Sequence, residues 1–509
     1  MSSTSYDFII VGAGPCGASI ASRLANTRSK PSVLLIESGG PNTDLKDRIA
    51  GERHIFWATS GKHLDYGYKT VPQTTLNGRQ IPYQRGKGLG GSTATNLGLW
   101  DYGSKPELDE WAKLVGDDVW RWDNARERLK KLPLNPDVNS DKCIGFGVPP
   151  GTIHDGLRVT AASAYLVKKP GNLNILTDSK VTRVLFEGKR AVGVELQGEK
   201  KYYSSKDTII CAGSIDTPKL LLLSGVGPAQ DLTKHGISVV IDHPAIGSNL
   251  LDHPMIRMVA PVKPGLIPPE TIAPMQGAME QWFKDRTGPL ATDNASTCHG
   301  YLKLDVASYP EFDSLNEQTR NLLSNPRTPA YELVCRIAPN PTQDGFLWNS
   351  STIMMNQQSV GRVSLRSADP DEPPAIDLNF LSHPYDLRVT VDAVRRTAEF
   401  LQSSIIPTDP FMFGPKSTKE TDLVADGQSQ EFIKSNLGHL WHAAGTVKMG
   451  KLGEPGTCVT PDFRVVGLEG LRVADLSVLP ILPSNHTQST AYLVGEIAAD
   501  KLVGEYRLD

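Results

Sequence analysis

The run Asp7-Phe8-Ile9-Ile10-Val11 leads directly into Gly12-Ala13-Gly14-Pro15-Cys16-Gly17, which is a G-x-G-x-x-G motif. After Asp7 the first run is continuously apolar, as expected of a buried parallel strand. Residues 18–26 then carry apolar side chains at helical spacing, and residues 33–36 repeat the strand pattern before Glu37. The order of strand, glycine turn, helix and second strand is that of a βαβ unit.

The glycines of this motif have distinct mechanical roles. Gly12 permits the tight turn, Gly14 lets backbone N–H groups approach a pyrophosphate, and Gly17 lets the helix pack on the strand. Glu37 follows Gly17 by 20 residues (37 − 17), where an acidic side chain accepts the hydroxyls of a ribose. The pattern therefore predicts a dinucleotide site, in which the carboxylate disfavours NADP. The motif alone leaves both FAD and NAD open.

The composition sets the broad class of protein. The chain has 509 residues, a net charge of −3 and a pI near 6.4, which favours two domains and gives no electrostatic case for nucleic acid or an anionic membrane. No apolar run approaches the roughly 20 residues that span a bilayer. Because the first strand starts at Asp7, we expect no signal peptide and a soluble, cytoplasmic protein. Secretion from a precursor trimmed before residue 1 is the open alternative.

The remaining sequence predicts two regions of different texture. Residues 83–96 interleave glycines with small hydroxyl residues, which suits backbone lying against a flat ligand. Further on, the patterns predict helices over 107–132, 161–166 and 217–224, and strands over 174–176, 181–186, 191–196 and 207–213. From about 256 to 429 prolines cluster and strands shorten. Met354, Met355 and the strand 361–365 indicate an antiparallel sheet in a second, substrate-binding domain.

Four ordered motifs together resemble the glucose-methanol-choline (GMC) oxidoreductase family, whose members bind FAD. Besides the N-terminal motif, residues 86–96 (GKGLGGSTATN) resemble the first family signature and residues 213–227 (GSIDTPKLLLLSGVG) match the second. His442-Ala443-Ala444-Gly445-Thr446 resembles the catalytic-histidine motif. Residues 471–475, followed by Ser484-Asn485-His486-Thr487-Gln488, resemble the C-terminal flavin motif.

The resemblance implies an α/β fold with a Rossmann-like FAD-binding domain and a smaller domain containing a mostly antiparallel sheet. The expected division is 1–255 for the N-terminal part of the FAD-binding domain, 256–429 for the substrate domain, and 430–509 for the C-terminal part. In some members a histidine before the asparagine of the first signature binds FAD covalently. Thr95 stands at that position here, so we expect non-covalent FAD.

The resemblance also implies a set of cofactor contacts. Val181 would lie against the adenine, Asn96 near the isoalloxazine ring and Asp475 near the ribityl chain. The full expected set is Gly12, Gly14, Pro15, Cys16, Gly17, Glu37, Ser38, Arg85, Gly91, Ser92, Asn96, Leu97, Val181, Ala212, Asp475, His486 and Thr487.

His442 and His486 are the expected catalytic residues. Oxidising an alcohol requires loss of the hydroxyl proton, and an imidazole with a pKa near 7 is suited to accept it. We assign His442 as the general base and His486 as the hydrogen-bond partner of the substrate oxygen, with hydride passing to flavin N5. The apolar helix beginning near Gln488 would present its N-terminus to the reduced flavin. His439 is a weaker candidate for the base, and no metal site is expected.

Trp441 and Trp100 are the expected substrate contacts. An aromatic residue at the position of Trp441 gates the pocket of aryl-alcohol oxidases in this family, so a bulky or aromatic primary alcohol is the leading substrate expectation. A packing role for Trp441 is equally open. The electron acceptor is left open as O₂ or another molecule. The alternatives to alcohol oxidation are a lyase or dehydrating cyclase on the same scaffold and, last, an FAD-binding structural protein.

Overall fold

The computed structural model describes residues 4–49, 61–130, 144–147, 150–262, 277–292, 298–339, 345–402 and 426–509. Its first layer is a seven-stranded sheet built on β1 (Ser5–Val11). The sheet has the order β8-β2-β1-β11-β10-β9, and β22 also pairs with β11. The neighbours of β1 are β2 (Val33–Ile36) and β11 (Lys201–Ile210), followed outward by β8 (Leu173–Leu176), β10 (Arg190–Leu196), β9 (Val181–Glu187) and β22 (Leu471–Val473). The pairs among β8, β2, β1, β11 and β22 are parallel, whereas β9, β10 and β11 are antiparallel.

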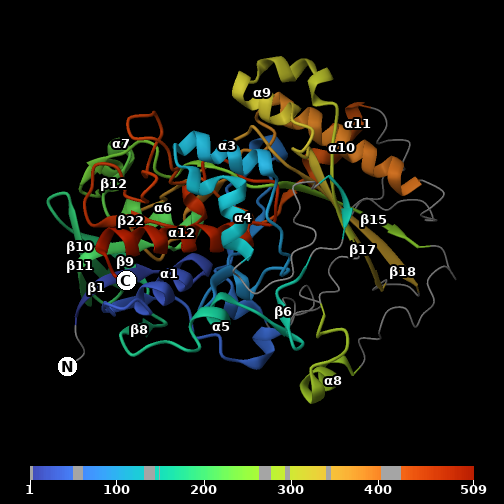
Figure 1. Ribbon diagram of the computed structural model, residues 1–509. Coiled ribbons are helices and arrows are strands. Elements are labelled where there is room, and N and C mark those ends of the chain that lie inside the picture. Colours follow the sequence, from blue (N-terminus) through green and yellow to red (C-terminus); the bar gives the residue numbers. More distant parts are fainter. Residues whose placement is uncertain are drawn as a thin grey trace.

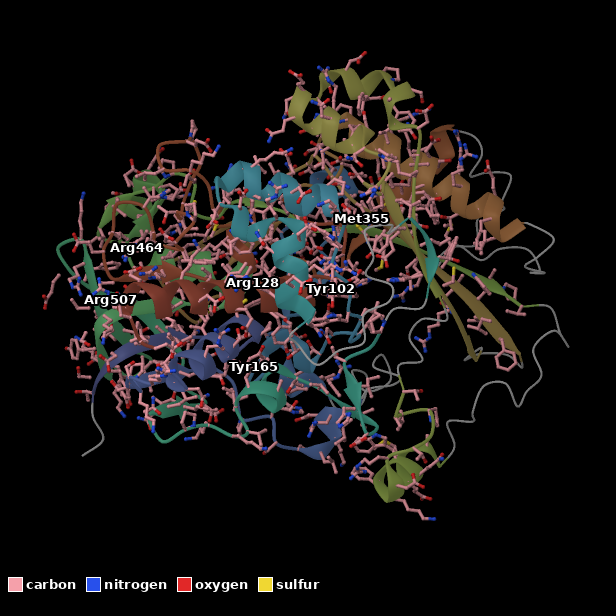
Figure 2. The ribbon with its side chains drawn as sticks, in the orientation of Figure 1. Tyr102, Arg128, Tyr165, Met355, Arg464 and Arg507 are labelled. Carbon is pink, nitrogen blue, oxygen red and sulfur yellow. The ribbon has the colours of Figure 1, made fainter. Side chains whose placement is uncertain are left out.

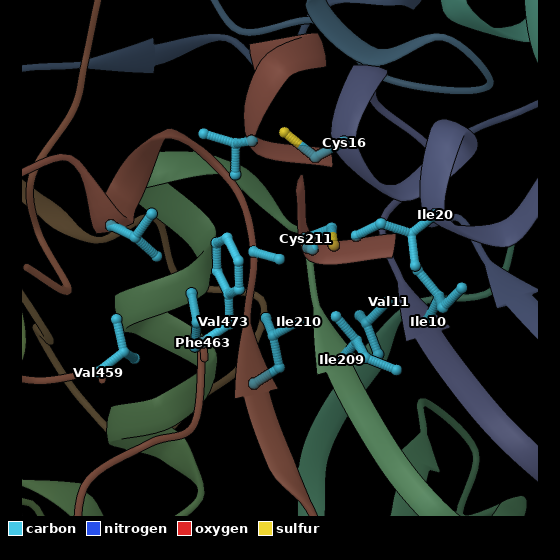
Figure 3. Close-up of a cluster of buried hydrophobic side chains, with 14 of the residues drawn as sticks. Ile10, Val11, Cys16, Ile20, Ile209, Ile210, Cys211, Val459, Phe463 and Val473 are labelled. Atoms are coloured by element: carbon cyan, nitrogen blue, oxygen red, sulfur yellow. The ribbon is translucent and has the colours of Figure 1, made fainter. Parts of the chain in front are cut away.

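Two helices from opposite ends of the chain pack together beside this sheet (Figure 1). They are α1 (Pro15–Ala25) and α12 (Gln488–Tyr506). The apolar strands bury Ile10, Ile209 and Val473 in one core (Figure 3). Gly17 makes this packing possible, because a Cβ there would lie 2.0 Å from the carbonyl oxygen of Gly12.

Polar contacts anchor α12 to neighbouring helices. The Tyr165 hydroxyl of α5 (Ala161–Tyr165) donates to Glu496 at 3.0 Å, and Arg128 of α4 (Trp122–Lys130) pairs with Asp500. Tyr165 and Arg128 are labelled in Figure 2. These contacts hold the middle of α12 against α4 and α5.

The second layer is an antiparallel sheet with the order β16-β17-β18-β15-β21. Its strands are β15 (Pro254–Pro261), β16 (Cys298–Leu302), β17 (Tyr331–Pro339), β18 (Phe346–Met354) and β21 (Gly438–His439), and α10 (Pro384–Gln402) packs on β18. A separate three-stranded sheet contains β14 (Ser248–Leu250), β19 (Gly361–Ser364) and β20 (Ala375–Asp377). The predicted α/β fold with an antiparallel second sheet is therefore confirmed, although residues 354 and 361 belong to different sheets.

The remaining helices and strands complete the described fold. They are α3 (Lys105–Val115), α6 (Gly213–Leu223), α7 (Ala229–Lys234), α8 (Ala278–Asp285), α9 (Glu317–Ser324), α11 (Asp426–Asn436), β3 (Tyr68–Lys69), β4 (Pro82–Tyr83), β5 (Gly145–Gly147), β6 (Ile153–His154), β7 (Leu157–Arg158), β12 (Val226–Gly227) and β13 (Ile241–Asp242). Within the described ranges, no helix has both the length and the apolar character needed to cross a bilayer.

One predicted helix is wrong in extent. The span 107–132 is two helices, because α3 ends where Gly116 adopts a left-handed φ of 72° and a turn precedes α4. Residues 131–132 lie outside the described ranges. The domain division stays a proposal. Because β21 pairs with β15, we place the return to the FAD-binding domain near residue 440 and not at 430.

Candidate active site

A cavity of about 1710 Å³ lies between the two sheets. On one side it is lined by the turn after β1, the end of β2, the β11–α6 junction and Asp475 after β22. In α/β sheets this edge, at the carboxyl ends of the parallel strands, is where ligands bind. On the other side it is lined by residues of β15, β17 and β18. His442 and His486 lie on its wall.

The glycine turn leaves room for a phosphate group. Gly14 and Gly213 both line the cavity. A Cβ at either position would meet no protein atom within 4 Å. The N-terminus of α1 at Gly14 carries no side-chain cap and no acidic residue in its first turn. Its N–H groups therefore remain directed at the cavity, which fits the pyrophosphate of a dinucleotide.

Glu37 ties three backbone segments together at the end of β2. Its carboxylate accepts hydrogen bonds from the N–H groups of Ala13 at 2.9 Å, Gly39 at 2.9 Å and Gly88 at 3.1 Å. Burial raises the pKa of this carboxyl, and the three donors oppose that effect. Glu37 also lines the cavity, so the predicted contact with ribose hydroxyls stays a prediction. Glu37 also has a structural role, because its hydrogen bonds join the glycine turn after β1 to the second glycine segment.

The second glycine segment packs directly on the first. A Cβ at Gly91 would lie 2.9 Å from the Cα of Gly14, and Gly91 itself adopts a φ of 52°. Downstream, the Asn96 side chain is held by Arg158, whose Nη1 donates at 2.7 Å, and by Gln488 at the start of α12. The Nε2 group of Gln488 is buried and has no hydrogen-bond partner within the described residues. An unpaired donor beside this cavity fits a polar ligand atom.

Asp475 joins β22 to the β11–α6 junction. Its Oδ2 accepts from the Gly213 N–H at 2.8 Å and the Thr217 hydroxyl at 2.6 Å, and its Oδ1 accepts from the Ser477 N–H at 2.8 Å. Burial raises the pKa of this carboxyl. The contacts place Asp475 at the cavity wall, as an acceptor beside the turn that holds Gly213.

The structure brings nearly all the expected cofactor residues to one cavity. Those lining it are Gly12, Gly14, Pro15, Cys16, Glu37, Ser38, Arg85, Gly91, Ser92, Asn96, Leu97, Val181, Ala212, Asp475, His486 and Thr487. Gly17 does not line it and acts through helix packing. These residues fit FAD, and each individual contact stays a prediction.

The expected substrate contact of Trp100 is wrong. This side chain is 1% exposed and packs against Tyr492 of α12, so it belongs to the core and not to the cavity. Trp441 does line the cavity, at its mouth, where it is 37% exposed. Its indole N–H donates to Gln84 at 2.7 Å, and its carbonyl accepts from Arg85 at 2.7 Å.

His442 lies in a setting that keeps its imidazole neutral. Its ring is buried, and its Nδ1 lies 2.9 Å from the Nδ1 of His253. Burial lowers the pKa of His442 well below its ordinary value, and the neighbouring His253, His486 and Arg85 act in the same direction. The expected pKa near 7 is therefore corrected downward. Burial likewise lowers the pKa of His253 to about 3.

His486 lies beside a carboxylate. Its Nε2 is 3.1 Å from Oε1 of Glu332, and the same oxygen is 2.6 Å from Nδ1 of His299. Burial alone would raise the pKa of Glu332, but the charge of His486 and the hydrogen bonds of both imidazoles outweigh it and hold the pKa well below its ordinary value. The rings of His442 and His486 are perpendicular, with centroids 5.2 Å apart.

Three of these residues were not singled out from the sequence. His253, His299 and Glu332 lie in no motif, and each acts through a residue far along the chain. His439, the weaker candidate for the base, does not line the cavity, and its Nε2 is 2.9 Å from the carbonyl oxygen of Pro82. His54, His154 and His235 carried no expected role, and His54 lies outside the described residues.

His299, Glu332 and His486 also have the donor types of a metal site. Their ligand atoms lie within 4.8 Å of one another, and they are the one such group found among the described residues. The shared carboxylate oxygen is at hydrogen-bond distance from both imidazoles. Hydrogen bonds therefore explain why the three side chains lie together, without a metal ion. We assign the group as a hydrogen-bonded triad.

Comparison with known proteins finds relatives that match nearly the full length of the chain. Family models described as GMC oxidoreductase match residues 6–135 and 132–255 with the N-terminal part and 357–495 with the C-terminal part. The dehydrogenase pkfF of Emericella nidulans is 28% identical over 97% of this chain and 92% of its own. An oxygen-dependent choline dehydrogenase of Rhizobium rhizogenes is 31% identical over 99% of this chain and 96% of its own.

Solved structures share the fold. A formate oxidase of Aspergillus oryzae matches with a TM-score of 0.84 at 24% identity, covering 99% of both chains. A fungal aryl-alcohol oxidase matches with a TM-score of 0.82 at 22% identity, again covering 99% of both chains. The chain therefore belongs to the GMC oxidoreductase family and is an FAD-dependent oxidoreductase.

Proposed function

We propose that this protein oxidises an alcohol to a carbonyl compound, with His442 as the general base and His486 as the hydrogen-bond donor to the substrate oxygen. The observation that carries the proposal is the contrast between the two rings. The two rings line one cavity and are perpendicular to each other. His442 lies beside a neutral histidine, His253, whereas His486 lies beside the carboxylate of Glu332. When bound, FAD supplies the two-electron oxidant that accepts a hydride from the carbinol carbon.

His253 suits His442 to accept a proton. The two Nδ1 atoms share one hydrogen, and we assign it to His442, so that the Nε2 lone pair of His442 is the base. After His442 takes the hydroxyl proton, its Nδ1–H continues to donate to His253. The low pKa of His253 keeps that neighbour neutral and able to accept.

Glu332 suits His486 to the opposite role. A carboxylate at 3.1 Å stabilises a protonated imidazole, which donates a hydrogen bond to the substrate oxygen. The positive charge of His486 in turn disfavours a second charge on His442, which stays neutral until it accepts the hydroxyl proton. The pair therefore divides proton acceptance from oxygen binding.

The relatives support an alcohol as substrate. One is named for choline dehydrogenation, and a structural neighbour is an aryl-alcohol oxidase. Trp441 at the cavity mouth favours a bulky or aromatic primary alcohol. The Thr95 hydroxyl donates to the carbonyl of Ser92 at 3.3 Å, and we propose that FAD is bound without a covalent link at this position.

Anaerobic mixing of the purified holoenzyme with a panel of alcohols tests the proposal. Bleaching of the oxidised flavin band, with formation of the matching aldehyde, is expected for at least the aromatic primary alcohols. His442→Ala should bleach far more slowly under the same conditions. If no alcohol bleaches the flavin and a non-redox substrate is turned over, the protein is a lyase or cyclase and the proposal is wrong.

A further inference from the structure

The face of the second sheet that lines the cavity carries two arginines on strands that flank β18. Arg257 of β15 pairs in register with Ser351 of β18, and Arg336 of β17 pairs with Asn349 of the same strand. All four residues line the cavity. Neutral polar side chains therefore lie between two cations on the wall opposite the dinucleotide turn.

Arg257 has no internal counter-ion. Its side chain is exposed and lines the cavity, and among the described residues it has no hydrogen-bond or ion-pair partner. Partial desolvation lowers the pKa of Arg257, and the charge of the nearby Arg336 lowers it further. Two like charges held close together in a cavity repel each other, and binding an anion between them relieves that repulsion.

The nearest carboxylate on the same strand is already used. Glu332 precedes Arg336 by four residues on β17, but its Oε1 accepts from both His299 and His486, and Glu332 does not line the cavity. Among the described residues, no carboxylate of β17 is therefore available to neutralise the charge of Arg257.

The two arginines have the same sequence offset from the partners of the two catalytic histidines. Arg257 follows His253, the partner of His442, by four residues, and Arg336 follows Glu332, the partner of His486, by four residues. Because β15 and β17 both run antiparallel to β18, these two offsets point in the same direction. Four residues of strand span roughly 13–14 Å at the usual rise per residue.

We propose that the substrate is an alcohol bearing an anionic oxygen group, which Arg257 binds next to Arg336 while the hydroxyl lies at His442 and His486. This inference rests on the proposed alcohol oxidation. Guanidinium groups match the geometry of carboxylate and phosphate oxygens through paired N–H donors. The separation along the strands favours an anion several bonds from the hydroxyl, as in a hydroxymethyl aryl acid, over an α-hydroxy acid.

Matched substrates of the holoenzyme test the charge requirement. The probes are 4-(hydroxymethyl)benzoate, 4-(hydroxymethyl)phenyl phosphate, neutral 4-methylbenzyl alcohol and a cationic 4-(trimethylammonio)benzyl alcohol. The larger kcat/KM between the first two identifies the anion as carboxylate or phosphate. We expect the better anion to exceed the neutral alcohol by about tenfold or more, as for a charge-assisted hydrogen bond. A neutral or cationic probe used as well as either anion would overturn the proposal.

Substitutions locate the effect. In Arg257→Gln the ratio of kcat/KM for the anionic over the neutral alcohol should fall by about 10- to 100-fold, mostly through KM, and Arg257→Lys should restore part of it. Arg28→Gln removes an exposed arginine that does not line the cavity and should leave the ratio unchanged. An unchanged ratio in Arg257→Gln, or an equal loss in Arg28→Gln, would contradict the assignment.

A binding measurement separates this proposal from the proposed oxidation. 4-Methylbenzoate cannot be oxidised at a carbinol, yet it should perturb the flavin absorbance of the wild type and bind more weakly to Arg257→Gln. 4-Methylbenzamide, its neutral counterpart, should bind weakly to both. If benzoate binds in this way while no alcohol bleaches the flavin, the anion site stands and alcohol oxidation fails. If alcohols bleach the flavin but benzoate and benzamide bind alike, the anion site fails.

Discussion

The Nδ1 atom of His442 lies 2.9 Å from the Nδ1 atom of His253, and both rings are buried. Two neutral imidazoles in this contact share one hydrogen, which leaves the second nitrogen of His442 as an acceptor or a donor according to the tautomer. The main-chain N–H of His442 also donates to Asp252, the residue before His253, at 2.9 Å. The base is thus fixed by a neighbouring pair from the β14–β15 connection.

The first prediction concerns pH. Because burial and the neighbouring cations lower the pKa of His442 well below its ordinary value, its base form persists as the pH falls through about 6.5. The rate of anaerobic flavin reduction should therefore stay constant across that range and fall only at lower pH, where imidazolium can no longer accept a proton. Stopped-flow measurements over the pH range test this.

Unfolding needs a separate control in that experiment. A histidine whose pKa is lowered in the folded state costs stability as the pH falls below its unfolded value of about 6.5. The Tm and bound FAD should therefore be measured at each pH, and rates compared only where both are retained. A rate that already halves near the unperturbed histidine pKa in fully folded enzyme would contradict the expected neutral base.

The second prediction separates the two histidines. His442→Ala should slow flavin reduction by about 10²- to 10⁴-fold, the usual effect of losing a general base, while FAD stays bound. His486→Ala should also slow reduction, with more of the loss in substrate affinity, because its role is to hold the oxygen. The fall in reduction rate at low pH should vanish in His442→Ala alone. Its loss in His486→Ala instead would mean that the roles are reversed.

How far the sequence predicts this site depends on the range of the contacts. Gly12, Gly14 and Glu37 were identified because a strand, turn and strand in series specify them locally. His442 and His486 were identified through family motifs. Glu332, however, is 154 residues from His486 and His253 is 189 residues from His442, so only the pairing of distant strands brings them together.

Trp100 shows the converse error. It follows the second glycine segment closely and was expected to contact the substrate. Its side chain turns instead toward α12 and packs on Tyr492, whose ring centroid is 5.6 Å away. Periodicity gives the apolar character of such a residue but does not give the direction in which it packs.

The break of the predicted helix at Gly116 was also missed from the sequence pattern. A left-handed glycine ends the helix there within an otherwise continuous amphipathic pattern.

The third prediction concerns the attachment of FAD. A threonine hydroxyl cannot form the histidyl link found in some family members, and Thr95 occupies the corresponding position. Acid precipitation of the holoenzyme should therefore release the flavin into the supernatant, where its absorbance is measured. Thr95→Ala should release the same fraction. Flavin that remains in the washed pellet would show a covalent bond to another residue.

The last prediction concerns Glu332, a positioning residue that acts through His486. Glu332→Gln keeps the size of the side chain and removes its charge, so the protonated form of His486 loses its counter-ion. We expect flavin reduction to slow by about 10- to 100-fold, the effect of losing a charge-assisted hydrogen bond. The rate should also decline at a lower pH on its alkaline side than in the wild type, because the carboxylate favours the protonated imidazole.

Stability gives an independent readout for the same variant. The pKa of Glu332 is lowered in the folded state, so its contribution to stability is present above the unfolded pKa of about 4.5 and is lost as the pH falls through the folded pKa. Glu332→Gln should therefore lower the Tm at neutral pH and lower it less in acid. Glu469→Gln, which removes an exposed carboxylate 3.9 Å from Arg190, should change neither the Tm nor the rate appreciably. Wild-type reduction with an unshifted alkaline limb in Glu332→Gln would mean that the carboxylate only packs beside His486, and the division of roles between the two histidines would lose its electrostatic basis.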